Sequence, residues 1–184
     1  VTHPRREVET SLGNLIADTL AECAECEVML VGSGPIRSQR LGPVVTLKDL
    51  MACFPYDDTI TKHWISGGRL KKIFEQIMRA DNRGGEGECY QVNGRVRAKY
   101  DEKAKKLTSL TIDNQTVDDK KIYSIAIQGY HYNNCQSYLN VSSEQLQEIN
   151  KTKIITTSAR QVLEEYLRQK QNVRQEVEGR LEYY

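Results

Sequence analysis

The sequence predicts an α/β fold with α+β-like features: a layered sandwich of mixed β-sheets covered by helices, formed by a single domain over residues 1–184. Helix and strand patterns alternate up to residue 82, short strand patterns cluster between residues 89 and 130, and helical patterns return after residue 142. A length of 184 residues suits one domain, and hydrophobic and charged contents of 39% and 28% suit a packed core.

The chain begins with one helix and one strand. In SLGNLIADTLAEC (11–23), apolar residues recur every three or four positions, which predicts a helix that Thr10 or Ser11 can cap. The run EVMLVG (27–32) is short, apolar and bounded by a glycine, which predicts a buried strand.

The next three elements continue the alternation. TLKDLMACF (46–54) predicts a short helix that Thr46 caps and Pro55 ends. DTITKHWIS (58–66) alternates between apolar and polar residues, which predicts a strand. GGRLKKIFEQIMRADN (67–82) places apolar residues on one face of a helix.

The middle of the chain predicts strands of an antiparallel or mixed sheet. Four alternating or apolar runs are separated by turn-forming residues: CYQV (89–92), RVRAKYD (95–101), KLTSLTID (106–113) and KIYSIAIQGY (121–130).

The end of the chain returns to helix. SSEQLQEIN (142–150) begins with a capping-box pattern, Ser142 to Gln145. SARQVLEEYLRQKQ (158–171) has an apolar face, and EGRLEYY (178–184) is compatible with a final edge strand.

Composition excludes several classes of protein. A formal net charge of +1 argues against a nucleic-acid-binding protein, which needs a strongly basic face. No apolar run approaches the roughly 20 residues that span a membrane. No signal peptide is visible, and the chain starts at Val1 without a methionine, so we expect a piece excised from a longer chain.

Five scattered cysteines do not form a disulfide framework. Cys23 and Cys26 form a C-x-x-C pair, which is compatible with a metal or redox site, but no second pair or histidine set completes it. Cys23 also continues the apolar stripe of its helix, which favours structural thiols. Free thiols favour a reducing compartment.

No complete catalytic set is visible in the sequence. Three histidines are present, and none belongs to a metal-binding or hydrolase motif. The adjacent Asp57 and Asp58 could be paired acids, but neighbouring side chains usually diverge, so we interpret them as turn residues.

A binding site is better supported than a catalytic one. The stretch GSGPIR (32–37) follows a predicted strand, and its glycines and Arg37 suit either a plain turn or a loop that holds an anion. Tyr56 and Tyr130 could stack on a flat heterocycle, or they could be amphipathic residues at the edge of the core.

Seven short motifs follow one another in a specific order between Glu9 and Leu181. They are E-x-x-L-G-N-L-I-A-D, GSGPIR, V-T-L-x-D-L, F-P-Y-D-D-T-I, S-G-G-R-L-K, Y-x-I-A-I-x-G-Y and E-G-R-L. Each motif alone is weak, but the ordered series resembles the C-terminal, substrate-binding domain of the 5′-nucleotidase family over nearly the whole chain.

The resemblance implies a division of labour between two domains. In that family a metallophosphoesterase domain comes first and holds two divalent metal ions and the catalytic Asp–His pair. The C-terminal domain binds the nucleoside and swings over the metal site. We therefore expect no catalytic residue, metal ligand or cofactor in this chain, an N-terminal metallophosphoesterase domain as its partner, and no activity of this chain alone.

The resemblance also implies site residues. Arg37 matches an arginine that contacts substrate, within a loop that includes Gly34. Tyr56 and Tyr130 match two phenylalanines that clamp the base, and Arg6 matches an arginine near the substrate in some members.

Besides the two tyrosines, four positions depart from the family pattern. Gly32 stands where the loop has asparagine, and Ser33 and Pro35 replace two of its glycines. Gln136 stands where an aspartate binds the ribose hydroxyls, and an amide oxygen accepts hydrogen bonds more weakly than a carboxylate. These changes put specificity for adenosine monophosphate in doubt.

The sequence thus predicts the substrate-binding domain of a metal-dependent 5′-nucleotidase-type phosphoesterase acting on nucleotides or other phosphate esters. The alternative is a non-catalytic ligand-binding or scaffold module that kept the fold and lost nucleotide recognition. Most of the family acts outside the cytoplasm, whereas the free cysteines allow a cytoplasmic location.

Overall fold

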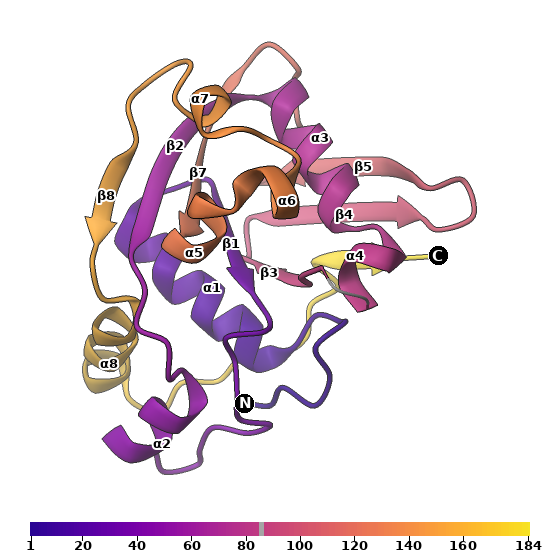
Figure 1. Ribbon diagram of the computed structural model, residues 1–184. Helices are drawn as coiled ribbons and strands as arrows, with labels where there is room; N and C mark the ends of the chain where they lie inside the picture. Colours follow the sequence, from indigo (N-terminus) through magenta and orange to yellow (C-terminus); the bar gives the residue numbers. More distant parts are fainter. Residues whose placement is uncertain (85–86) are drawn as a thin grey trace.

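A computed structural model describes residues 1–84 and 87–184 and has two mixed β-sheets with helices packed on them (Figure 1). The larger sheet has the strand order β3-β1-β7-β2-β8, and the smaller one has the order β6-β5-β4-β9. β1 and β7 are parallel, as are β4 and β9, and the other pairs are antiparallel. The architecture confirms the predicted fold class.

The strands are β1 (Val28–Gly32), β2 (Ile60–Ser66), β3 (Tyr90–Val92), β4 (Val96–Asp101), β5 (Lys106–Ile112), β6 (Gln115–Thr116), β7 (Ile122–Gln128), β8 (Lys153–Thr156) and β9 (Leu181–Tyr183). The helices are α1 (Ser11–Ala24), α2 (Leu47–Cys53), α3 (Gly67–Ile77), α4 (Ala80–Gly84), α5 (Gly129–Asn133), α6 (Cys135–Leu139), α7 (Ser143–Leu146) and α8 (Ala159–Lys170).

The larger sheet separates two apolar clusters. Alternate residues of β1 point to opposite faces, so Val28 and Leu30 join one cluster while Met29 and Val31 join the other. Helices α1, α2 and α8 cover the Met29 side. Helices α3, α6 and α7 and the smaller sheet cover the Val28 side, with α5 and α6 in front of the larger sheet in Figure 1.

Polar caps start the helices where the sequence places them. Thr10, one of the two predicted caps of α1, accepts a hydrogen bond from the amide of Gly13 at 3.0 Å. Complete capping boxes start α2, at Thr46, and α7, at Ser142. These three helix starts confirm the capping predictions.

The helix predicted over 67–82 is wrong in its extent, because the chain forms α3 and then the separate short helix α4. The side-chain amide of Asn82 donates to the carbonyl oxygens of Ile77 (3.4 Å) and Glu88 (3.0 Å). The Nε of Arg83 donates to the Met78 carbonyl at 3.2 Å. Side chains therefore satisfy carbonyls at the end of α3 that a continuing helix would have used.

The strand predicted over 121–130 also ends early. β7 stops at Gln128, and Gly129 and Tyr130 begin α5. The Gly129 amide still donates to Thr59 O at 2.7 Å, but the Tyr130 amide donates to a side chain, Asp58 Oδ2, at 2.9 Å. The sequence patterns also missed α5, α6, β6 and β8, which are all five residues or shorter.

The C-terminal strand β9 lies at the edge of the smaller sheet, as predicted. A buried carboxylate, Glu9, fastens the segment before it by accepting from the backbone amides of Glu178 (2.8 Å) and Arg180 (2.7 Å). The two ends of the domain therefore pack against each other. Among the described residues, no helix has the length and apolar character needed to cross a membrane.

Candidate functional site

The loop over residues 32–37 uses its backbone amides inside the protein. Five of its amides donate hydrogen bonds of 2.8–3.1 Å to protein acceptors. Those of residues 32 and 34 bind the side chains of Gln128 and Glu88, and those of residues 33, 36 and 37 bind the carbonyl oxygens of Cys89, Ser33 and Cys53. Pro35 has no amide hydrogen. The loop therefore offers an anion no backbone N–H group, and the exposed Arg37 side chain is its cationic group.

Gly34 is explained by space rather than by conformational freedom. A β-carbon on this residue would stand 2.7 Å from Glu88 Oε2 and 2.8 Å from Arg6 Nη2. The glycine thus lets the Glu88 carboxylate and the Arg6 guanidinium lie close to the loop. Whether Gly34 also meets a ligand stays a prediction.

The structure brings Arg37 and Tyr56 together. Arg37 Nη2 donates to the Tyr56 hydroxyl at 3.2 Å, and the guanidinium carbon lies 5.3 Å from the ring centroid. The ring itself is 55% exposed. Charge and an accessible aromatic surface therefore lie side by side.

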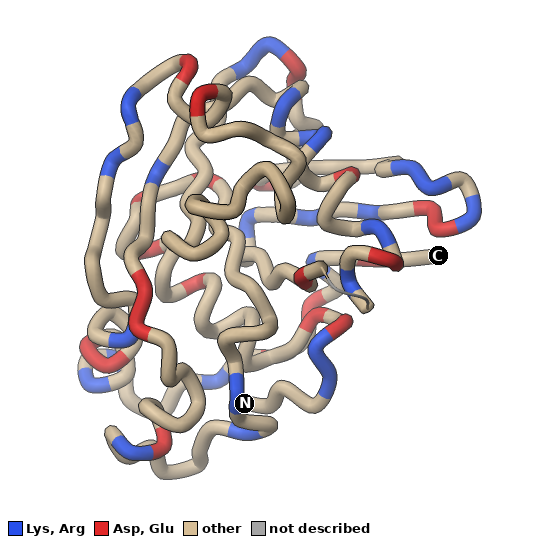
Figure 2. Tube along the Cα trace, in the orientation of Figure 1, with Lys and Arg blue, Asp and Glu red and all other residues tan. Residues whose placement is uncertain are grey.

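Arg37 and Arg6 line one hollow of about 610 Å³. Residues 3–7 form one wall, and residues 36–39 form the other. Arg5 lines it as well, and Glu7 is the acidic residue in the lining. Over the rest of the chain basic and acidic residues are interspersed (Figure 2), so this hollow is a local concentration of arginine rather than part of a basic face.

Tyr130, at the start of α5, is also 55% exposed, and its backbone is held beside the turn that carries Tyr56. The hydroxyl of Tyr130 lies 3.3 Å from that of Tyr138. This hydrogen bond, together with burial, raises the pKa of Tyr138 to about 12. Within the described chain the rings of Tyr56 and Tyr130 do not stack on each other.

No hydrogen bond among the described residues links the Gln136 side chain to Arg37, Tyr56 or Tyr130. Gln136 lies exposed on α6, and its side chain makes no hydrogen bond within residues 1–84 and 87–184. The position leaves the amide accessible to solvent, and its role toward a ribose stays a prediction.

A buried polar cluster behind the loop was not predicted from the sequence. His131 Nε2 lies 3.7 Å from Glu88 Oε2, and both side chains are at least 90% buried. Both ring nitrogens of His131 and the hydroxyl of Tyr90 lack hydrogen-bond partners in the described structure. Burial raises the pKa of Tyr90 well above its ordinary value. The available signal was the two-residue spacing of Glu88, just before β3, and Tyr90, at its start, because residues two apart in an extended chain point the same way.

The adjacent acids Asp57 and Asp58 diverge, as expected for turn residues. Asp57 accepts from Ser158 Oγ at 2.8 and 2.9 Å and pairs with Arg160. Asp58 turns the other way and accepts from the amide of Tyr130. They are paired with protein groups rather than with each other.

The C-x-x-C pair lacks the properties of a redox site. Cys23 is exposed and Cys26 is buried, and no disulfide joins them. Burial raises the pKa of the Cys26 thiol to about 12, which keeps it protonated and unreactive. Within residues 1–84 and 87–184, no three His, Cys, Asp or Glu side chains gather as a metal-binding group.

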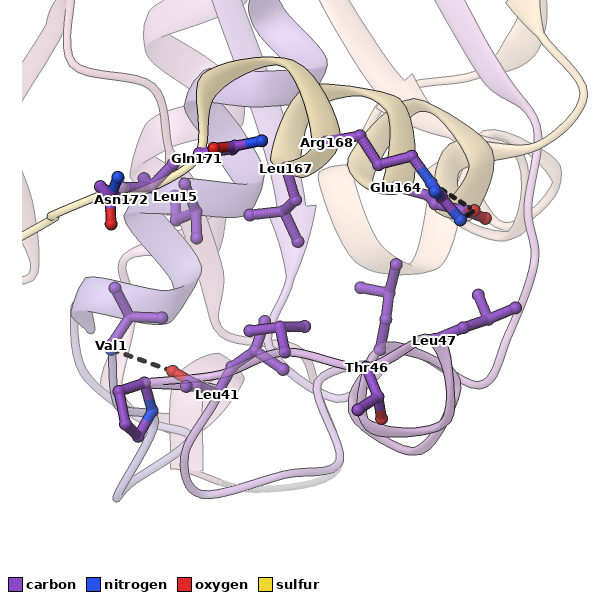
Figure 3. A pocket seen from close by; sticks show the side chains of 15 residues that line it. Val1, Leu15, Leu41, Thr46, Leu47, Glu164, Leu167, Arg168, Gln171 and Asn172 are labelled. Carbon is purple, nitrogen blue, oxygen red and sulfur yellow. Dashed lines mark hydrogen bonds and ion pairs between the residues drawn. The ribbon is translucent and has the colours of Figure 1, made fainter.

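A second hollow, of about 460 Å³, lies between α8 and the loop before α2 (Figure 3). Leu15, Leu47 and Leu167 line it, and its charged groups Glu164 and Arg168 pair with each other at 2.8 Å. None of the predicted site residues lies in its lining.

Comparison with known proteins identifies the family to which the chain is similar. Residues 1–143 match the family model described as 5′-nucleotidase, C-terminal domain. A snake venom 5′-nucleotidase from Naja atra is 30% identical over 128 residues, covering 60% of this chain and 24% of that protein.

Two solved structures share the fold. A 5′-nucleotidase precursor from Thermus thermophilus has a TM-score of 0.80 at 19% identity, covering 99% of this chain and 38% of that one. An NAD nucleotidase from Haemophilus influenzae has a TM-score of 0.83 at 14% identity, covering 99% and 36%. The chain thus spans less than two-fifths of the length of these relatives, and it belongs to the family of 5′-nucleotidase C-terminal domains.

Proposed function

We propose that this chain is the nucleoside- or nucleotide-binding domain of a metal-dependent 5′-nucleotidase-type phosphoesterase. The observation that carries the proposal is the contact with Tyr56 made by Arg37, which shares a hollow with Arg6. Tyr130 is held on the adjacent turn and lines a neighbouring hollow. The names of the relatives, which include 5′-nucleotidases and an NAD nucleotidase, support the same substrate class.

Each residue has a distinct part in this proposal. Arg37 and Arg6 bind the anionic part of the substrate, because guanidinium groups match phosphate oxygens in charge and geometry. Tyr56 and Tyr130 stack on the base, an interaction worth about 1–3 kcal/mol per base. Gln136 meets the ribose hydroxyls.

Catalysis belongs, in this proposal, to a metallophosphoesterase domain that precedes the chain in the parent protein. Two divalent metal ions held there would activate the attacking water. The described residues supply binding and orientation of the substrate, and the chain alone is expected to show no phosphatase activity with added Mn²⁺ or Zn²⁺.

Titration of the 184-residue chain with adenosine, uridine and their monophosphates, followed by NMR, tests the proposal. Saturable binding should weaken about 5- to 100-fold in Tyr56→Ala and Tyr130→Ala, the equivalent of one stacking contact. Arg37→Ala should weaken binding of the monophosphate more than that of the nucleoside. Tyr184→Ala, which removes another exposed tyrosine, is the matched control.

The second candidate is a ligand-binding or scaffold module that has lost nucleotide recognition. Two observations favour it. The backbone amides of the loop over residues 32–37 already donate to protein acceptors, and Gln136 stands where the family has an aspartate. No saturable binding of any of the four compounds would support this candidate and contradict the first.

A further inference from the structure

A single carboxylate, that of Asp58, connects the two turns that carry Tyr56 and Tyr130. Its Oδ2 accepts from the Tyr130 amide at 2.9 Å, while its Oδ1 accepts from the amide of Thr59 at 2.8 Å. Thr59 in turn accepts from the amide of Gly129 at 2.7 Å through its carbonyl oxygen. Tyr56 is two residues before Asp58, so the turn that carries Tyr56 and the backbone of Tyr130 meet at this carboxylate.

We propose that Asp58 is a positioning residue that sets the separation of the Tyr56 and Tyr130 rings, a role that rests on the proposed function. It contacts neither ring and acts through the backbone of each turn. A flat base fits between two rings only when their spacing matches its thickness, so an anchor shared by both turns controls binding without touching the ligand.

The local packing is built around this carboxylate. A β-carbon on Gly129 would stand 2.8 Å from Asp58 Oδ1, so the glycine lets the carboxylate approach the start of α5. The hydrogen bond to Tyr130 is charge-assisted and is stronger than one from a neutral acceptor. The backbone carbonyl of Asp58 also accepts from the amide of Ala159 at 2.9 Å, which fixes the turn from the other side.

The neighbouring Asp57 provides a matched control. It has the same side chain, one residue earlier on the same turn, and it accepts from Ser158 and Arg160 at the start of α8. Removing either carboxylate breaks hydrogen bonds that stabilise the fold. Of these two aspartates, Asp58 is the one that reaches the backbone of Tyr130.

The test measures adenosine affinity and thermal stability of the 184-residue chain in three variants. Asp58→Ala should weaken adenosine binding about tenfold, because the geometry of the two turns is released. Asp57→Ala should lower the melting temperature about as much as Asp58→Ala does, but it should leave the adenosine affinity within about twofold of wild type. Asp58→Asn keeps an oxygen acceptor for the Tyr130 amide and should recover most of the affinity.

Amide hydrogen exchange gives a second readout that needs no ligand. The Tyr130 amide should be protected in wild type and in Asp57→Ala and should exchange faster in Asp58→Ala. Unchanged affinity in Asp58→Ala, or equal weakening in Asp57→Ala, overturns the positioning role while leaving the proposed function intact. If the wild-type chain binds uridine or a monophosphate and not adenosine, the same comparison is made with that ligand; no binding of adenosine, uridine or either monophosphate overturns the proposed function and this role with it.

Discussion

The imidazole ring of His131 fills the space beside Gly32 in which any other residue would place its β-carbon. The carboxyl carbon of Glu88 lies close on the same side, 3.2 Å from that position. The loops that this one resembles carry asparagine here, and no such side chain fits unless the ring moves. The glycine and the histidine are therefore one structural unit.

Substituting Gly32 with alanine should lower the free energy of unfolding by about 1–3 kcal/mol, because the new methyl group overpacks a closed site. Urea denaturation measures this. Gly84→Ala, where a β-carbon meets nothing within 4 Å, should be neutral or stabilising. Combining Gly32→Ala with His131→Ala should cost less than the sum of the two changes, and strict additivity would argue against the unit.

Two arginine–aspartate pairs should differ sharply in their contribution to stability. Arg180 is 1% exposed and donates to both carboxylate oxygens of Asp18 at 2.8 Å and to the Val92 carbonyl. Arg180→Met removes the cation from Asp18, which keeps hydrogen bonds from Gly94 and Gln175, and takes the buried donor from the Val92 carbonyl, so it should cost about 3 kcal/mol. Arg95 also forms a bidentate ion pair, with the carboxylate of Asp113, but this pair lies on the surface. Arg95→Met should therefore cost less than about 1 kcal/mol in the same denaturation assay.

Acid should weaken the fold through His63. Burial lowers the pKa of this histidine to about 4 from an ordinary value of 6.5, so the folded protein holds the neutral ring. The unfolded chain takes up the proton first. The free energy of unfolding is then fully retained above pH 6.5 and should fall between about pH 6.5 and 4, by up to about 3 kcal/mol.

The same denaturation series on His63→Phe isolates this effect. The variant keeps a ring at the position and cannot titrate, so its stability should change less across the window. Burial also lowers the pKa of His3, so the unfolding free energy of both proteins should have a smaller additional dependence on pH, of the same sign. Identical slopes for the two proteins would rule out His63 as the source.

Only one of the cysteines should react quickly with a thiol reagent in the folded protein. Cys23 is exposed, whereas the other four are buried, and burial raises the pKa of Cys26 and Cys89 to about 12 and that of Cys53 to about 11. Mass spectrometry after brief labelling should find one adduct, and none in Cys23→Ser. Rapid labelling of Cys26, or a disulfide between Cys23 and Cys26, would contradict this prediction and support a redox role for the pair.

The sequence predicted the fold where local patterns and packing agree. Apolar spacing located α1, β1, β2 and α8, and cap residues such as Thr46 and Ser142 located the starts of short helices. It failed where hydrogen bonds from side chains to the backbone decide where an element ends. Asn82 caps the Ile77 carbonyl at the end of α3, and the distant Asp58 binds the Tyr130 amide where β7 gives way to α5.

The candidate site divides in the same way. The order of motifs indicated Arg37, Tyr56 and Tyr130, and the structure brings Arg37 into contact with Tyr56. The sequence pattern could not reveal that the Gly34 amide donates its hydrogen bond to Glu88, because the two residues are 54 positions apart. Nor could it distinguish Asp57 from Asp58, whose difference lies wholly in which distant segment each one reaches.

The buried carboxylate of Glu9 has a consequence for the order in which the domain assembles during synthesis. Asn14 of the first helix donates to this carboxylate locally, but its two backbone donors, the amides of Glu178 and Arg180, lie up to 171 positions later. These contacts form only after nearly the entire domain has left the ribosome, and until then the nascent chain lacks them and is accessible to chaperones and proteases.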